Sequence, residues 1–155
     1  MQRAHFLRLG RQFGALALTA TVIFAAAIPA RAEIDPKYYR EWQERATEAL
    51  VVRVTAVKTS VASEKHSSGS FALVHTRVDA SATVEKVERT GTGLKPGDAI
   101  RIQYVSTRPS EPMPGPRPVP VLKRGEAYPA FLLAVSKGLY APAAKGASFE
   151  PLITQ

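Results

Sequence analysis

Cysteine and asparagine are both absent from the 155 residues, and histidine occurs only three times. Without cysteine the chain can form no disulfide, no thiolate nucleophile, no lipidated N-terminal cysteine and no zinc site built on thiolates. Without asparagine it has no acceptor for N-glycosylation. No Walker-type Gly-Lys-Ser/Thr motif occurs, and the pair Gly91 and Gly93 is not followed by a helical pattern. Nucleotide binding is therefore not expected.

The length of the chain suits one domain of ordinary size. Beyond residue 32 the only histidines are His66 and His75, and no matched third ligand accompanies them. A protein metal site needs more ligands than these two side chains supply. We therefore expect no metal, no cofactor and no catalytic residue.

The first 32 residues have the pattern of a secretory signal peptide. Four arginines and no acidic residue occur in this segment, an uncharged stretch runs over 12–30, and Ala30 and Ala32 are the small residues of a cleavage site. The uncharged stretch is also just long enough for a membrane anchor, although its alanine-rich composition is weakly apolar. Removal of the segment is the prediction, and retention as an anchor is the alternative. The location expected is periplasmic or secreted.

The strong positive charge of the chain belongs in part to this segment. The whole sequence has 21 basic and 13 acidic residues, a net charge of +8. Taking the 4 arginines of residues 1–32 from the 21 basic residues leaves 17 against 13, a net charge of +4. With both signs interspersed, that charge is typical of an ordinary soluble surface, so no nucleic-acid partner is expected.

A helix is predicted over 33–49. Asp35 can cap its N-terminus, and proline at position 36 is tolerated in the first turn. Aromatic and small residues recur on one side of it at helical spacing: Tyr38, Tyr39, Trp42, Ala46 and Ala49. We expect this stripe to pack on the end of a barrel, and a platform for stacking a ligand is the alternative.

From Leu50 onward the apolar residues alternate with a period of two, which is typical of strands. A slip in the alternation after Val84 predicts a bulge or bend near Glu85 and Lys86. Residues 59–70 are polar and are predicted to form a loop. Strands are predicted over 50–58, 71–88, 99–105, 127–135 and 139–143, with a further short strand over 149–153. The absence of βαβ alternation favours a small antiparallel barrel or sandwich.

Four stretches carry a resemblance to a known family. They are V-V-R-V-T-A-V, V-E-K-V-E, L-K-P-G-D-A-I-R-I and L-K-R-G-E-A-Y-P-A-F-L, in this order along the chain. Over residues 46–143 this arrangement resembles the OB-type barrel of netrin-like domains, the fold of the tissue inhibitors of metalloproteases. The family's inhibitors chelate a protease zinc with an N-terminal cysteine held by disulfides. This chain has no cysteine, so the resemblance implies the fold and not that mechanism.

Polar residues on one face of the second predicted strand form a candidate binding site. His75, Arg77, Asp79 and Ser81 alternate along it, as on the solvent face of a half-buried strand or the ligand-binding face of an OB fold. A hydrolase that uses His75 is a further alternative, but residues in line on one strand do not easily converge. With two residues of the next strand, the candidate binding residues here are His75, Arg77, Arg101 and Tyr104.

A proline-rich segment over 108–120 is the most unusual local feature. Six of the chain's twelve prolines lie in it, and such a sequence favours extended polyproline II structure. It is predicted either to be a plain insert between strands or to bind a partner, with Arg108 and Arg117 as its candidate contact residues.

Together these features predict a signal peptide over 1–32, a helix over 33–49 and an OB-like barrel over 50–155. The fold class expected is mainly β, a five-stranded antiparallel barrel with one N-terminal amphipathic helix. The function expected is that of an exported, non-enzymatic binding or accessory module for a protein or envelope component, without stable membrane insertion. The alternative is a protease-inhibitor-like domain that acts by loop insertion, as the fold resemblance implies.

Overall fold

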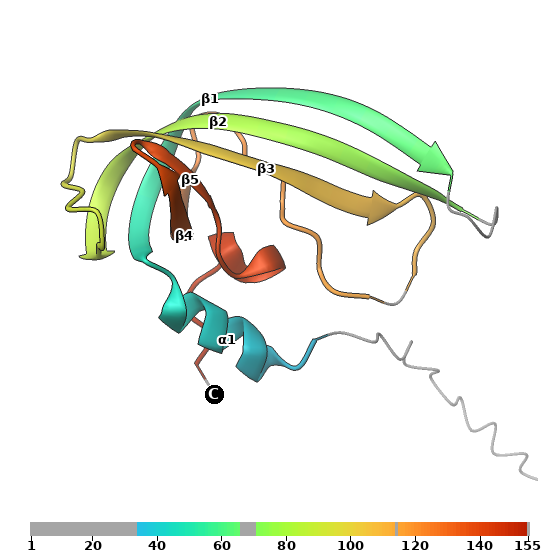
Figure 1. Ribbon diagram of the computed structural model, residues 1–155, viewed down its shortest axis with the longest axis horizontal. Helices are drawn as coiled ribbons and strands as arrows, with labels where there is room; N and C mark the ends of the chain where they lie inside the picture. The colour runs from blue at the N-terminus through green and yellow to red at the C-terminus, as the bar shows by residue number, and fades with distance from the viewer. Residues whose placement is uncertain (1–33, 66–70, 114, 155) are drawn as a thin grey trace, which may run out of the picture.

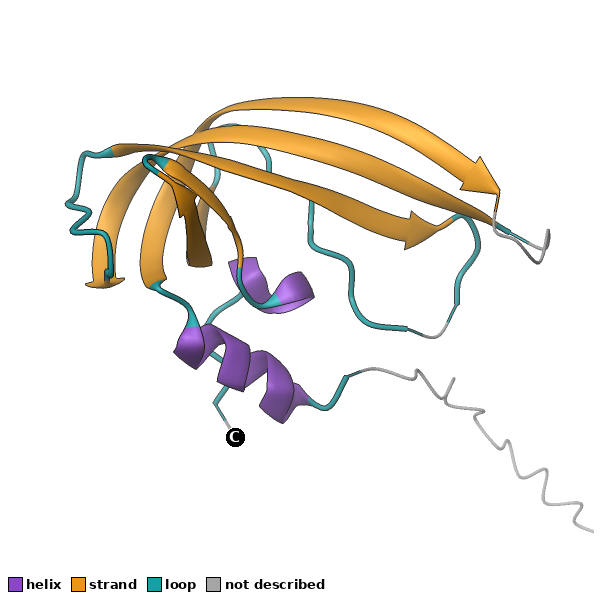
Figure 2. Ribbon diagram, in the orientation of Figure 1, coloured by secondary structure: helices purple, strands orange, loops and turns teal. Residues whose placement is uncertain are grey.

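A computed structural model describes residues 34–65, 71–113 and 115–154. These residues form one helix, α1 (Pro36–Arg45), a 3₁₀ helix, η1 (Lys145–Phe149), and the strands β1 (Glu48–Lys65), β2 (Ala72–Arg89), β3 (Ala99–Pro109), β4 (Ala127–Ser136) and β5 (Leu139–Pro142) (Figures 1 and 2). The predicted signal peptide, with Ala30 and Ala32, lies outside the described residues. Neither helix in the described part of the chain has the length and apolar character needed to span a bilayer.

The five strands close into a barrel in the order β1-β2-β3-β5-β4, with β4 returning to pair with β1. The prediction of a mainly β fold with a five-stranded barrel and a helix is confirmed. The prediction that every neighbour is antiparallel is wrong, because β3 and β5 run parallel where Arg101 pairs with Leu139. A closed ring with an odd number of strands cannot alternate direction all the way round, so at least one pair must be parallel.

From Val78 to Val84 every second residue of β2 points inward, and these residues form one side of the barrel core. Val78, Ala80, Ala82 and Val84 are buried and pack with side chains of β1 and β3. Directly after Val84 the register of the ladder shifts: Val52 pairs with Val84, but the preceding residue of β1 pairs with Lys86, so that one residue of β2 is left without an opposite partner. The bulge predicted near Glu85 and Lys86 is thus confirmed, and it bends β2 around the barrel.

Beyond the barrel, β1, β2 and β3 continue as a long three-stranded sheet that projects to one side (Figure 1). The predicted loop over 59–70 is wrong for 59–65, because β1 extends to Lys65, which pairs with Ala72. Serine and threonine side chains are tolerated there because the surface is exposed, while pairing with β2 satisfies the backbone. The third strand likewise runs to Pro109 rather than ending at residue 105.

Helix α1 ends at Arg45, four residues before the predicted limit, because the chain from Glu48 already belongs to β1. The guanidinium of Arg89 donates to the backbone carbonyl oxygens of Gln43 and Ala46 at 2.9 and 3.1 Å, which satisfies acceptors at the helix end. The aromatic stripe packs, as expected. Tyr39 is fully buried against Ala144 and Ala147, at and within η1, whereas Ala46 and Ala49 are buried against Phe131 of the barrel strand β4. Tyr38 is exposed.

The predicted strand over 149–153 is wrong. Phe149 ends η1 and is buried in the barrel core, and no strand follows it over residues 150–154. The fully buried amide of Gln43 takes the place of a strand partner. It donates to the carbonyl oxygens of Ala147 and Pro151 and accepts from the backbone N–H of Ile153 at 3.0 Å. A side chain from α1 therefore satisfies backbone groups that a sheet ladder would otherwise pair.

Candidate binding face on β2 and β3

One face of the β2–β3 sheet is turned away from the barrel core, and we call it the outer face. Because side chains alternate along a strand and opposite residues share a face, the ladder defines its members. They are the pairs His75 with Thr107, Arg77 with Val105, Asp79 with Gln103 and Ser81 with Arg101. The outer face thus brings together three of the predicted site residues: His75, Arg77 and Arg101.

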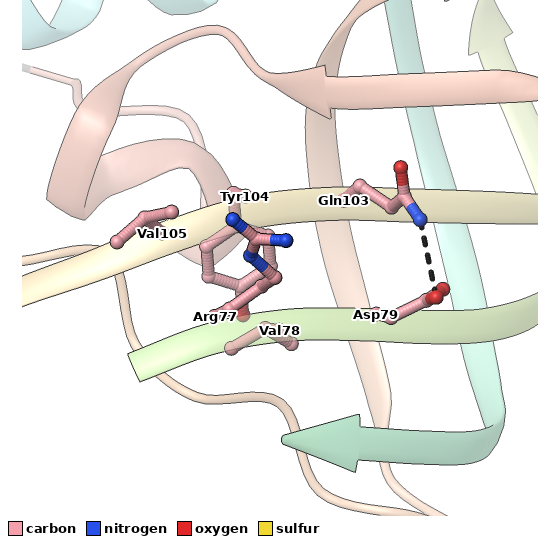
Figure 3. Close-up of a pocket in the computed structure, with 6 residues that line it drawn as sticks. All are labelled: Arg77, Val78, Asp79, Gln103, Tyr104 and Val105. Carbon is pink, nitrogen blue, oxygen red and sulfur yellow. Dashed lines mark hydrogen bonds between the residues drawn. The ribbon is translucent and has the colours of Figure 1, made fainter. Parts of the chain in front are cut away.

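Asp79 is the centre of a hydrogen-bonded network on the outer face. The Nε of Arg101 donates to Asp79 Oδ1 at 2.7 Å, and a second guanidinium nitrogen donates to Oδ2. Gln103 Nε2 donates to the same Oδ2 at 3.1 Å (Figure 3). The bonds from Arg101, and to a lesser extent Gln103, lower the pKa of Asp79 to about 2. Asp79 is therefore a carboxylate at neutral pH, and Arg101 is engaged by it.

Arg77 lies on the same face as this network but takes no part in its hydrogen bonds. Its side chain is exposed and makes no hydrogen bond or ion pair with any residue that the structure describes. Lys58 of β1 stands directly opposite Asp79 and also lowers the pKa of that carboxyl. Arg101 and Lys58 thus act on the Asp79 carboxylate, and with Arg77 on the same face the centre of the outer face carries more positive than negative charge.

A hollow of about 400 Å³ marks this place on the sheet. Its outer-face members are Arg77, Asp79, Gln103 and Val105 (Figure 3). The remaining lining residues are Val78 and Tyr104. They pair with each other between the Arg77–Val105 and Asp79–Gln103 pairs, and so form the floor of the hollow. The hollow thus lies across β2 and β3.

His75 does not join Asp79 in a catalytic arrangement. Its Nδ1 shares a hydrogen bond of 2.9 Å with the Thr107 hydroxyl, and its Nε2 lies 3.8 Å from Glu64. Asp79 lies four residues along the same strand, about 13 Å away at the usual rise, and is bonded to Arg101 instead. The His75, Asp79 and Ser81 side chains therefore lack the contacts that a hydrolase triad requires.

Tyr104 is on the opposite face, so the expected grouping of Arg77, Arg101 and Tyr104 is wrong for this residue. Tyr104 pairs with the buried Val78, and its hydroxyl donates to the carbonyl oxygen of Pro120 at 2.6 Å. The same hydroxyl accepts from the backbone N–H of Leu122 at 3.3 Å. Burial raises the pKa of Tyr104 to about 12. Tyr104 therefore holds the chain at the C-terminal end of the proline-rich segment.

The two arginines of the proline-rich segment also lie off the outer face. Arg108 is exposed and pairs with Val74, on the same side of the sheet as Tyr104. Arg117 donates from Nη1 to both carboxylate oxygens of Glu150, at 3.0 and 2.9 Å, and its guanidinium lies 5.0 Å from the ring centroid of Tyr39. Arg117 thus binds within the molecule, and this placement gives no support to a role in partner contact.

Sequence reasoning missed Lys58 and Gln103 as members of the site. Nothing local in the sequence indicates that the Gln103 side chain reaches Asp79. Lys58 belongs to the outer face only because the β1–β2 hairpin sets it opposite Asp79. Period-two alternation from the buried Val52 and Val54 would place Lys58 on the core side, and the register shift between Val54 and Ala56 moves it to the outer face.

Comparisons with known proteins give no relative: no family model, no curated protein and no solved structure matches the chain. Within 34–65, 71–113 and 115–154 no group of three or more acidic or histidine side chains could hold a metal ion. The absence of a metal or cofactor stays a prediction. The outer face is the strongest candidate for a functional surface.

Proposed function

We propose that the protein is an exported, non-enzymatic binding module and that its outer face binds an acidic, extended segment of a protein or envelope component. The observation that carries this proposal is Arg77. Its exposed guanidinium has no partner among the described residues, and it borders a hollow flanked by Lys58 and the Asp79–Arg101 pair.

The charge arrangement favours an anionic ligand. Arg101 is engaged by Asp79, so that the exposed Arg77 is the arginine of this face left for a partner. A guanidinium presents a planar fork of donors that matches a carboxylate bidentately. Gln103 fixes the second oxygen of Asp79, which keeps that carboxylate from turning toward Arg77. Arg77 is thus kept ready for an external carboxylate.

The architecture supports the same site. A five-stranded barrel with the order β1-β2-β3-β5-β4 fits an OB-like fold, in agreement with the resemblance to netrin-like domains. OB folds bind extended ligands across their second and third strands. The hollow lies on those two strands here. This support is an analogy of fold, and the chemistry of the ligand comes from the side chains.

Loop insertion into a protease is the weaker alternative. An inhibitory loop must be able to enter a cleft, but the C-terminal part of the proline-rich segment is held from several sides. Ser106 Oγ donates to the carbonyl oxygen of Val119 at 2.6 Å, in addition to the Tyr104 and Arg117 contacts. No observation on the described part of this loop favours insertion over anchoring.

A titration with a short acidic peptide tests the proposal, because Arg77 can be changed without touching the core. We expect the purified protein to bind a glutamate-rich peptide at low salt and not a lysine-rich one. Arg77→Glu should weaken that affinity about tenfold or more, and Arg77→Lys should weaken it less but measurably, since the bidentate geometry is lost. Isothermal titration calorimetry gives the dissociation constants.

Arg124→Glu is the matched control, because Arg124 is an exposed arginine in the turn before β4 and does not line the hollow. It makes the same change of net charge and should leave the affinity nearly unchanged. Equal weakening by Arg77→Glu and Arg124→Glu would mean that only overall charge matters, and the proposed site would be wrong. Absence of binding to the acidic peptide at low salt would also contradict the proposal.

A further inference from the structure

The projecting sheet ends on one side in a long strand edge that the described chain leaves unpaired. The pairing of β4 with β1 stops at Arg53, and the last backbone bonds to this edge connect Val54 with Gly125 and Glu126. From Ala56 to Lys65 the strand pairs with β2 on one side only. Figure 1 shows β1 as the outermost strand of the projecting sheet. Exposed edges of this kind are templates for another strand.

The β3 edge of the same sheet, unlike the β1 edge, has chain packed along it. Beyond its short pairing with β5, the β3 strand holds the chain at Val119 and Pro120 through the side chains of Ser106 and Tyr104. Pro109 lies at its end, where proline cannot donate to a ladder. On the β1 edge there is no proline from Ala56 to Lys65, and the exposed fraction of Val61 is 67 %.

The residues of this β1 edge are complementary to themselves. If two copies pair antiparallel with Val61 opposite Val61, then Lys58 of each copy stands opposite Glu64 of the other, and Thr59 stands opposite Ser63. Lys58 and Glu64 both lie on the outer face of β1. Opposite charges, hydroxyl pairs and β-branched pairs directly across a ladder are favourable. Among registers that keep the same face outward, only this one pairs Lys58 with Glu64.

We propose that two copies of this chain pair through β1 in this register and form one continuous six-stranded sheet. The two-fold axis then passes through Val61, perpendicular to the sheet, and the interface is isologous. Both outer faces consequently lie on the same side of the joined sheet. The barrels lie at opposite ends, because each occupies the Glu48 end of its own β1 (Figure 1). The assembly would present two hollows to one extended partner, but the pairing itself does not depend on ligand binding.

Charge reversal tests the register. Sedimentation velocity of the purified protein over a wide concentration series should give a monomer–dimer equilibrium. Lys58→Glu and Glu64→Lys should each weaken the dimer about tenfold or more, because two attractive pairs become repulsive. The double variant Lys58→Glu/Glu64→Lys should restore the dimer. Lys137→Glu, in the exposed turn between β4 and β5, should have no effect.

A cysteine placed at the axis gives a second readout, since the chain has no cysteine of its own. Val61→Cys puts two thiols directly opposite, within the Cα separation that a disulfide spans, and should crosslink rapidly under mild oxidation. Thr59→Cys lies on the same face, but its two copies are about 13 Å apart, and it should crosslink slowly. A monomer at every concentration, failure of the double charge reversal to restore the dimer, or equal crosslinking at 59 and 61 would overturn the proposal.

Discussion

Gly146 of η1 packs directly on Arg117 of the proline-rich segment: a Cβ on Gly146 would lie 2.6 Å from both the Cβ and the carbonyl oxygen of Arg117. That distance is shorter than any Cβ contact, so only glycine fits there. The close approach lets Arg117 reach Glu150 and the ring of Tyr39. A segment with the composition of a free loop is thereby joined to the C-terminal segment and α1.

We expect Gly146→Ala to destabilise the protein by about 2 kcal/mol, because the added methyl group forces the backbone of residues 117 and 146 apart. Urea unfolding followed by tryptophan fluorescence measures the loss, since Trp42 packs beside the same cluster. Gly115→Ala is the matched control. Nothing lies within 4 Å of a Cβ at Gly115, so that variant should change the free energy of unfolding by less than about 0.5 kcal/mol.

Tyr104→Phe removes the hydroxyl that bonds Pro120 and Leu122, and we expect a loss of about 1–2 kcal/mol in the free energy of unfolding. Hydrogen exchange should show faster exchange of the Leu122 amide. Tyr38→Phe changes an exposed tyrosine outside the core and should leave both measurements unaltered. If the two variants behave alike, the Tyr104 hydroxyl does not hold this segment.

The raised pKa of Tyr104 also has a consequence for stability at alkaline pH. In the unfolded chain a tyrosine ionises near pH 10, whereas in the folded protein the pKa of Tyr104 is about 12. The folded state therefore binds the proton more tightly, and stability decreases as pH rises from 10 toward 12. Unfolding measured across this range should show a smaller decrease for Tyr104→Phe than for the unchanged protein. An equal decrease would contradict the assignment.

The Asp79 network predicts the opposite dependence at acid pH. The pKa of Asp79 in the folded protein is about 2, below its usual value of 3.8. Its ion pair with Arg101 thus stabilises the fold above pH 4, and that contribution disappears as pH falls through 2. The pair is solvent-exposed, so Asp79→Asn should lower the melting temperature by only a few degrees at pH 6.

That difference in melting temperature should shrink toward zero as the pH is lowered to 2. Glu111→Gln serves as the control, because it makes the same change of net charge at an exposed position without a described hydrogen bond. A difference between Asp79→Asn and the unchanged protein that stays constant from pH 6 to pH 2 would contradict the lowered pKa.

Gln43 is predicted to be the most sensitive polar residue of α1. Its buried amide bonds the chain at Ala147, Pro151 and Ile153, so Gln43→Ala leaves these backbone groups without their partner. We expect a loss of about 2–3 kcal/mol. Denaturant unfolding and exchange of the Ile153 amide measure it. Glu41→Ala, on the same helix but in a weak surface pair of 3.9 Å, should cost little, and an equal loss would contradict the role of Gln43.

Much of the fold follows from local patterning. The alternation of Val78, Ala80, Ala82 and Val84 predicted both the strand and its buried face. The slip in the alternation after Val84 predicted the bulge. The candidate site was predicted in part. Period two correctly groups His75 with Arg77, but the same parity excludes Tyr104 from the face that includes Arg101.

The alternation, the mainly β fold class and the exclusions that follow from the absence of cysteine can all be read from the amino-acid sequence. These depend only on a residue and its near neighbours. Three features become visible only in the folded chain: β3 and β5 run parallel, residues 59–65 continue β1, and Arg117 binds Glu150. Each of these depends on a partner far along the chain. Ring closure, strand pairing and the contact of Gly146 with Arg117 supply those partners, and no local pattern encodes them.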